Sequence, residues 1–433
     1  MTELGASGNA ARPLQPASTK PCQLADGCAS SCFETGVRMS LFIGTAFSDL
    51  FAAFGTGVGI FVGGFTVGRV LGSRRRKAII SQAKGEAAAA QSKFDDLKQV
   101  LDGEVDLWLR ESTIDIGPML THLANSIPII TVCNFKGGVG KTTVSANLAA
   151  YFNAKDKRVL LIDFDYQGSL TDKLLSSADL DHLEASAIRL IKGEGSAESV
   201  LGKSVSLHPA LSKARLFPCF YGFHKEENRI LTRWLTDQKR NEIRFTLHSY
   251  LHSSEFQKSF DIVIIDAPPR LTTGTINAVC ASTHLLIPTV LDNMSTQAAL
   301  NTLGAFYEVR RSFLPTLRIL GIVPTFVAQA GRLNEREADA LVAMQERMPE
   351  YWKSPPLPEI FSDSWVCRRE AIAKVAGQGI AYLSDSSTRA MFEALGERVE
   401  RGIFLADTTG SSPGIDRHSR IQPAKEDRLR VVQ

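Results

Sequence analysis

The sequence predicts an α/β fold with a mainly parallel, twisted sheet flanked by helices, preceded by a transmembrane helix and a helical linker. Three observations lead to this prediction. Short β-branched apolar runs alternate with helical stretches, a glycine-rich turn joins the first run to a helix, and a long uncharged stretch lies near the N-terminus. The 433 residues are 44% hydrophobic and 22% charged, as in folded proteins, and a net charge of +3 gives no general case for a nucleic-acid binder.

Residues 1–38 are rich in Ala, Ser, Gly and Pro and have no apolar periodicity, so they are predicted to be a disordered leader. Met39 is an alternative start. The leader contains three of the seven cysteines, which could hold a metal or a lipid, although a flexible tail is the simpler explanation. The scattered spacing of the other four favours reduced thiols.

A transmembrane helix is predicted within residues 41–71, because residues 50–68 carry no charge and are followed by a basic cluster from Arg69 to Lys77. Nineteen residues in a helix span about 28 Å, close to the thickness of a hydrocarbon core. The cluster would hold the C-terminal side in the cytosol, which predicts a single-pass protein of the inner (cytoplasmic) membrane. Repeated glycine spacing would allow self-association. The alternative is a buried or interfacial helix in a cytoplasmic protein.

Residues 73–112 are charged and partly amphipathic, which predicts a helical linker or, equally, a helix packed on the following domain. A domain at 125–405 is predicted from the alternation of apolar runs with helical stretches, which indicates βαβ units. A tail at 406–433 is expected to be disordered. The predicted strands are residues 129–133, 159–162, 262–265, 285–288 and 317–323.

The first apolar run leads into a glycine-rich loop and then an amphipathic helix, the order that a phosphate-binding loop requires. Glycines let the backbone curl so that its N–H groups point at phosphate oxygens, and the helix N-terminus adds partial positive charge. Lys141 is expected to reach the β- and γ-phosphates, and the Thr142 hydroxyl to ligate Mg²⁺. The predicted nucleotide-binding residues are Gly137, Gly138, Val139, Gly140, Lys141, Thr142 and Thr143.

The loop departs from the general pattern, since Phe135 stands where a glycine is usual and a second lysine, Lys136, precedes the glycine pair. In this it resembles the deviant Walker A loop of the ParA/MinD ATPases. The resemblance implies a P-loop NTPase fold, ATP as the nucleotide, and a homodimer that sandwiches the nucleotides. It also implies that Lys136 crosses the dimer to the partner's phosphates, as a catalytic residue alongside Lys141 and Asp165.

Two acidic strand ends extend the resemblance. The Asp163-Phe-Asp165-Tyr166-Gln-Gly segment is similar to the family's Asp-x-Asp-Pro-Gln-Gly signature, with Tyr166 in place of proline. By resemblance Asp163 supports the Mg²⁺ shell and Asp165 positions the attacking water. Asp266 ends another apolar strand, the Walker B arrangement, and would hold Mg²⁺ through water. The order matches the family over roughly residues 127–405, and adenine as the base rests on resemblance alone.

The resulting prediction is a membrane-tethered, Mg²⁺-dependent ParA/MinD-like ATPase whose ATP-dependent dimer positions or segregates a cargo, either DNA or a protein assembly. An activating protein partner is also expected. Two alternatives stay open: a bacterial tyrosine kinase, although no tyrosine follows Tyr382, and a scaffold that binds nucleotide without hydrolysis. A DNA surface could form from scattered basic residues, for which solvated helix faces are the common alternative: Arg310, Arg311, Arg368, Arg369, Arg398 and Arg401.

Overall fold

The computed structural model describes residues 79, 81–86, 88, 105–124, 126–178, 186–236, 242–375 and 379–404. The chain divides into two units, Met1–Lys93 and Phe94–Gln433. In the first unit the described residues are helical and mostly exposed. The predicted leader, span and tail lie outside the described residues. Within the described ranges no helix combines the length and the apolar character that crossing a bilayer requires.

The second unit is built on an eight-stranded sheet in the order β3-β4-β2-β5-β1-β6-β7-β8. All neighbouring strands are parallel except β3 and β4, which are antiparallel. The mainly parallel sheet predicted from the sequence is therefore confirmed. The strands are β1 Ile129–Val132, β2 Val159–Asp163, β3 Val205–Ser206, β4 Ala214–Phe217, β5 Ile262–Asp266, β6 His284–Val290, β7 Arg318–Val327 and β8 Val366–Cys367.

Helices cover both faces of the sheet, and the strands are accordingly apolar on both sides. In β2, Leu161 joins a core with α4, α5 and α15, whereas Leu160 and Ile162 join a core on the opposite face with α6, α9, α10 and α11. Such burial on both faces is why parallel strands appear as continuous apolar runs instead of alternating ones. The helices are α3 Gly117–Ala124, α4 Lys141–Ala154, α5 Ser169–Ser177, α6 Ala187–Lys192, α7 Ala197–Leu201, α8 Phe223–Thr236, α9 Thr246–Leu251, α10 Ser254–Ser259, α11 Thr273–Ala281, α12 Asn293–Ser312, α13 Glu335–Tyr351, α14 Glu370–Lys374, the 3₁₀ turn η2 Ala381–Leu383 and α15 Ser386–Phe404.

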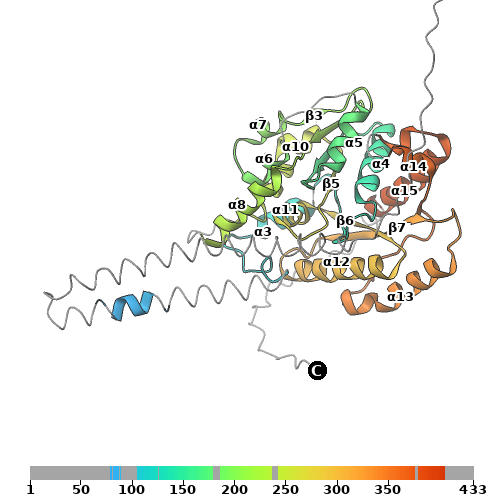
Figure 1. The fold of residues 1–433 in the computed structure, drawn as a ribbon. Helices are drawn as coiled ribbons and strands as arrows, with labels where there is room; N and C mark the ends of the chain where they lie inside the picture. The colour runs from blue at the N-terminus through green and yellow to red at the C-terminus, as the bar shows by residue number, and fades with distance from the viewer. Residues whose placement is uncertain are drawn as a thin grey trace, which may run out of the picture. The chain divides into compact units, whose positions relative to one another are not determined.

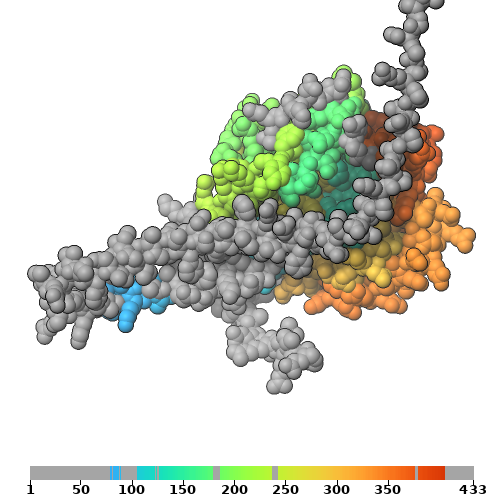
Figure 2. All heavy atoms as spheres, in the orientation of Figure 1, coloured from blue at the N-terminus to red at the C-terminus, as the bar shows by residue number. Residues whose placement is uncertain are grey.

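Two helix pairs frame the sheet. Helices α4 and α15 pack together on one face, and α12 and α13 lie side by side on the other (Figure 1). In the space-filling view α12 and α13 form a continuous orange surface (Figure 2). Gly396 lies where α15 crosses α4, and a Cβ there would come within 2.4 Å of the Tyr151 ring. The glycine therefore sets the close approach of these two helices.

The end of the predicted linker is part of this unit and is not helical. Residues 105–109 form turns, and Trp108 is buried with its ring stacked 5.8 Å from that of Trp234 in α8. Arg244 donates to the carbonyls of Trp108 at 2.7 Å and Arg110 at 2.8 Å, and it forms a buried ion pair with Glu242. The segment that contains Trp108 and Arg110 is thus held by a buried arginine, which amphipathic periodicity alone did not indicate.

Candidate functional site

The carboxyl ends of three adjacent parallel strands form the candidate site. In the order β2-β5-β1, β5 lies between the other two, and its last residue, Asp266, is in register with Asp163 of β2 and Val132 of β1. The glycine-rich loop begins directly after β1. Segments separated by more than 100 residues therefore meet at one edge of the sheet, where the ligands of open α/β sheets bind.

The loop itself is shaped by two glycines with left-handed backbone, Gly138 at φ +73° and Gly140 at φ +88°. Gly140 precedes α4, and no side chain of the described residues caps that helix end. The first N–H groups of α4 are therefore available to an anion, and the helix dipole favours negative charge there. The hydroxyl of Thr325, at the end of β7, donates to the Val139 carbonyl at 2.8 Å and ties the loop to the sheet.

Lys141, the first residue of α4, is 7% exposed, and its ammonium donates to the Lys136 carbonyl at 2.9 Å. Burial lowers the pKa of Lys141, and the charges of Asp266 and Asp165 oppose that shift. Among the residues that the structure describes, no carboxylate forms an ion pair with this buried ammonium. It is therefore suited to receive an anionic ligand.

Lys136 points to a different place from Lys141. Its ammonium donates to the Ser295 hydroxyl at 2.8 Å and lies 3.5 Å from a carboxylate oxygen of Asp292, at the N-terminus of α12. The side chain is 30% exposed, so it lies at the surface of the protomer. The two lysines thus diverge, with Lys141 inside the loop and Lys136 on its outer side.

Asp266 is surrounded by hydroxyl groups from α4. Thr142 donates to one carboxylate oxygen at 2.7 Å and Ser145 to the other at 3.1 Å. Burial raises the pKa of Asp266 to about 6, and the Thr142 hydrogen bond and the Lys141 charge limit the rise. The carboxylate is thus held next to the hydroxyl that was predicted to bind the metal.

Asp163 is fully buried, and both of its oxygens accept hydrogen bonds. The Asp165 N–H donates to one at 3.0 Å, and the Thr171 N–H and hydroxyl donate to the other at 2.9 and 2.7 Å. Burial and the nearby charge of Asp266 raise the pKa of Asp163. Asp165 is half-buried, and its carboxylate accepts from the Gln167 N–H at 3.0 Å. Asp163 therefore organises the turn that presents Asp165.

The donor set fits Mg²⁺ better than a transition metal. Thr142 and Asp266 offer hard oxygen atoms, and among the described residues no group of three or more His, Cys, Asp or Glu side chains forms a metal cage. Mg²⁺ is usually held by one or two protein oxygens together with phosphate oxygens and water. The pair of Thr142 and Asp266 beside an anion-binding loop matches that requirement.

Several residues that complete the site were not predicted. Ser145 lies three residues after Thr142 on α4, and both hydroxyls donate to Asp266, so helical spacing could have indicated it. Ser295 and Asp292 hold Lys136, and Thr171 holds Asp163, through contacts that cross the fold. No local sequence pattern indicates these contacts.

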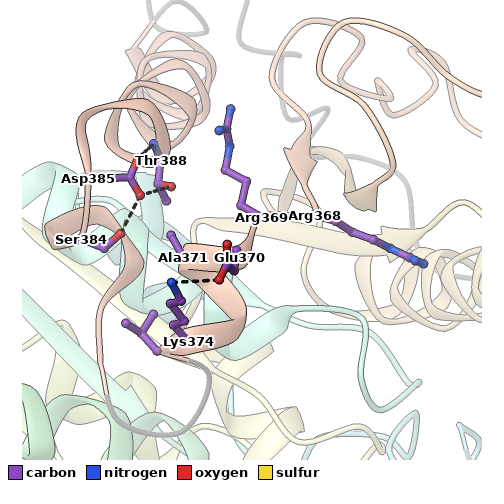
Figure 3. Close-up of a pocket in the computed structure, with 9 residues that line it drawn as sticks. Arg368, Arg369, Glu370, Ala371, Lys374, Ser384, Asp385 and Thr388 are labelled. Carbon is purple, nitrogen blue, oxygen red and sulfur yellow. Dashed lines mark hydrogen bonds and ion pairs between the residues drawn. The ribbon is translucent and has the colours of Figure 1, made fainter.

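The basic residues that suggested a DNA surface make local contacts. Arg311 pairs with Glu308, Arg398 with Glu359, and Arg401 lies 3.9 Å from Asp363. Arg368 and Arg369 border a shallow hollow of about 670 Å³, and their side chains point apart (Figure 3). Arg368 donates to the Phe326 carbonyl and Arg369 to the Ser387 hydroxyl. A DNA surface stays a prediction.

Known proteins resemble this chain in sequence and in fold. Residues 127–319 match the family model described as an AAA domain. The chromosome-partitioning ATPase Soj of Thermus thermophilus is 31% identical over 201 residues, which cover 45% of this chain and 68% of Soj. Two solved structures share the fold at 22% identity and a TM-score of 0.50. They are apo McdA from Cyanothece, covering 63% of this chain and 99% of McdA, and a cobyrinic acid a,c-diamide synthase from Mycobacterium smegmatis with bound ATP analogue and magnesium, covering 65% and 96%.

Proposed function

Because the chain belongs to the ParA/MinD family of P-loop ATPases, we propose that it binds ATP with Mg²⁺ and hydrolyses it in a nucleotide-dependent homodimer. ATP turnover would control the dimer, and the dimer would position or segregate a cargo. The observation that carries the proposal is the convergence of three groups beneath one loop: the Lys141 ammonium, the Thr142 hydroxyl and the Asp266 carboxylate. A relative that is a chromosome-partitioning ATPase supports this class of activity.

The residues of this chain divide the work as follows. The N–H groups of the loop and of the first turn of α4 bind the phosphates, and Lys141 neutralises charge on the β- and γ-phosphates. Asp165, which is held by the turn around Asp163, orients the attacking water and accepts its proton. Thr142 and Asp266 would hold Mg²⁺, which when bound neutralises charge on the phosphate oxygens.

Dimerisation is supported by the position of Lys136. Its ammonium lies on the outer side of the loop, held by Ser295 and Asp292, and not over its own phosphate-binding residues. In this proposal the side chain leaves these two partners and contacts the phosphates bound by the partner subunit. The homodimer then completes each site with a lysine from the other copy.

Membrane tethering is proposed from the uncharged residues 50–68 and the basic residues that follow them. The ATPase unit would lie on the cytosolic side of the inner membrane. A permanent span would leave attachment constant, so ATP turnover would change the dimer and the binding of an activating protein or a cargo. DNA is one candidate cargo, supported by the partitioning role of Soj.

The test uses the full-length chain in detergent micelles. Wild type, Lys141→Ala and Asp165→Ala are compared for Mg²⁺-dependent ATP hydrolysis, ATP binding and mass by light scattering, with and without duplex DNA. Lys155→Ala is the matched control, because Lys155 is an exposed lysine at the C-terminal end of the same helix. Alkaline carbonate extraction of cell membranes tests the span.

The expected result is slow hydrolysis by wild type and Lys155→Ala, none by Lys141→Ala, and an ATP-bound dimer trapped by Asp165→Ala. If no variant binds ATP, or if Lys141→Ala hydrolyses as fast as wild type, the proposed function is wrong. If carbonate extracts the full chain into the supernatant, the proposed membrane span is wrong. The proposed ATPase function is not affected by that result. A DNA effect on hydrolysis would support DNA as the cargo.

A further inference from the structure

The first turn of α8 lies between the two acidic segments of the site. Phe223 is buried, and its ring stacks on that of Phe164 with centroids 5.5 Å apart. Phe164 stands between Asp163 and Asp165 in the chain. One residue further along α8, the His224 ring lies 5.5 Å from the ring of Tyr166, which follows Asp165. This turn therefore packs directly against the segment that carries Asp165.

The same turn also contacts the segment that follows Asp266. Glu227 is 5% exposed, and its Oε1 atom accepts two hydrogen bonds, from the Thr272 hydroxyl at 2.8 Å and from the Gly274 N–H at 2.7 Å. Thr272 caps α11, which begins seven residues after the end of β5. A single oxygen of α8 therefore fixes the start of the helix that follows Asp266.

The contact leaves no free space. A Cβ on Gly274 would lie 2.9 Å from Oε1 of Glu227, 3.4 Å from the Phe223 ring and 3.5 Å from Cβ of Phe164. Only glycine allows this approach, and both acidic segments meet α8 at this point. The Arg270 guanidinium also lies 5.8 Å from the Tyr166 ring, which adds a second link between the two segments.

Burying a carboxylate costs free energy, because desolvation disfavours its charge, so a buried carboxylate usually has specific hydrogen-bond or charge partners. Burial raises the pKa of Glu227, while the bonds from Thr272 and Gly274 and the charges of Arg270 and His224 act in the opposite direction. Its neighbour Glu226 instead forms surface ion pairs with Lys192 and Arg229. The hydrogen bonds of Glu227 thus join α8 to the segment that follows Asp266, and none of the steps proposed above uses it.

We propose that Glu227 is a positioning residue for ATP hydrolysis, which holds the residues between Asp266 and α11 in register with the turn that carries Asp165. The proposal rests on the ATPase function proposed above. If it is correct, loss of the Oε1 acceptor misaligns Asp165 relative to the phosphates without removing any group that binds them. Hydrolysis then slows while ATP binding stays, because misplacement by even about 1 Å can lower a rate by about 100-fold.

The experiment uses the full chain at 15 °C, with kcat and KM for ATP and the ATP dissociation constant measured separately. Glu227→Ala is expected to lower kcat at least tenfold and to change ATP binding less than threefold. Glu227→Gln keeps an oxygen that can accept both bonds and should stay within threefold of wild type. Gly274→Ala, which forces the two segments apart, should lower kcat as Glu227→Ala does. The matched control is Glu226→Ala, which should hydrolyse at the wild-type rate.

Three results would overturn the proposal: an unchanged kcat in Glu227→Ala, an equal loss in Glu227→Gln, or a loss of ATP binding as large as the loss of kcat. Melting curves show whether each variant is folded. If Glu227→Ala does not fold, two variants decide: Thr272→Val, which keeps the shape of threonine without the hydroxyl, and Thr272→Ser, which keeps the hydroxyl. A rate at least threefold lower for valine than for serine supports the positioning role, and equal rates contradict it.

A wild type without hydrolysis would refute the proposed function, and amide hydrogen exchange then tests the positioning role separately. The Gly274 N–H should exchange at least tenfold faster in a folded Glu227→Ala variant than in wild type, because its acceptor is gone. Unchanged exchange across residues 270–274 would overturn the proposal whatever the ATPase result.

Discussion

Replacing Arg244 with methionine should destabilise the ATPase unit more than any surface charge change. Methionine keeps the aliphatic bulk near the ring of Trp234, whose centroid is 5.6 Å from the guanidinium, but removes every donor. Both side chains of the Arg244–Glu242 pair are almost fully buried, at 1% and 2% exposure. The variant therefore leaves a carboxylate in the interior without its cation.

The magnitude follows from the contacts that are lost. Burial raises the pKa of Glu242, and the hydrogen bonds and charge of Arg244 outweigh this effect and hold the pKa below its usual value. Removing one partner of a buried pair costs about 3–5 kcal/mol. Two carbonyls, those of Trp108 and Arg110, also lose their charged donor. A loss of about 4 kcal/mol is expected, which in a unit of this size lowers Tm by roughly 8 °C.

Two assays are suitable. Calorimetry of the full chain measures the Tm of Arg244→Met beside Arg311→Met, the same substitution in an exposed ion pair, which should shift Tm by less than 2 °C. Trypsin measures release of the segment at 105–112, because the Arg110 carbonyl that Arg244 holds belongs to the bond that trypsin cleaves. Cleavage after Arg110 should accelerate at least tenfold in Arg244→Met.

The double variant Glu242→Gln/Arg244→Met provides the decisive comparison. It removes the unpaired charge and should recover about half of the lost Tm. The reasoning is refuted if Arg244→Met melts within 2 °C of wild type, or if the double variant is no more stable than Arg244→Met. Either result would mean that the pair contributes no net stability and that apolar packing alone holds the 105–112 segment.

Three further predictions concern the helix crossing and the metal side of the site. Gly396→Ala should lower Tm by several degrees, since its Cβ would meet the buried Tyr151 ring at 2.4 Å and overpacking costs about 1–3 kcal/mol. The control is Gly402→Ala, whose Cβ would meet a methyl group of Leu320 at 3.1 Å. It should lower Tm less in the same melt. In Mg²⁺-free protein the raised pKa of Asp266 means that the folded state keeps a proton that the unfolded state loses. The unfolding free energy should therefore fall by about 2 kcal/mol between pH 4 and pH 6, and denaturation of Asp266→Asn at the same pH values should show a clearly smaller fall. Ser145→Ala removes one donor to Asp266, and the Mg²⁺ concentration for half-maximal hydrolysis should rise about tenfold in a titration; an unchanged midpoint would exclude this supporting role.

The parallel sheet could be predicted because its strands are buried on both faces. The five predicted runs correspond to β1, β2, β5, β6 and β7, whose apolar character is local and strong. The short edge strands β3 and β8 have only two residues each and are held by their neighbours, so no periodicity can develop in them. β4 includes Arg215, whose guanidinium donates to the hydroxyl and the carbonyl of Ser204. This charged residue interrupts the apolar run, so β4 was not predicted as a strand.

In the candidate site, too, some residues could be predicted from the sequence and others could not. The loop, Lys141, Thr142 and Asp266 could be predicted because a glycine turn between a strand and a helix has a strict local chemistry. The groups that hold these residues could not be predicted, because Glu227 meets Gly274, and Ser295 meets Lys136, only after the chain has folded. Tyr166 was noted as a substitution for proline, but its contacts with His224 and Arg270 depend on α8 and the segment after β5.

The four cysteines of the described unit are free and buried, and this makes them internal reporters of opening. Burial raises the pKa of Cys133, Cys219 and Cys280 well above the usual thiol range, so the closed protein has almost no thiolate to react with a disulfide reagent. Cys133 follows β1 directly and precedes the glycine loop. With the other six cysteines replaced, the modification rate of Cys133 therefore measures how often the nucleotide site opens, without an added label.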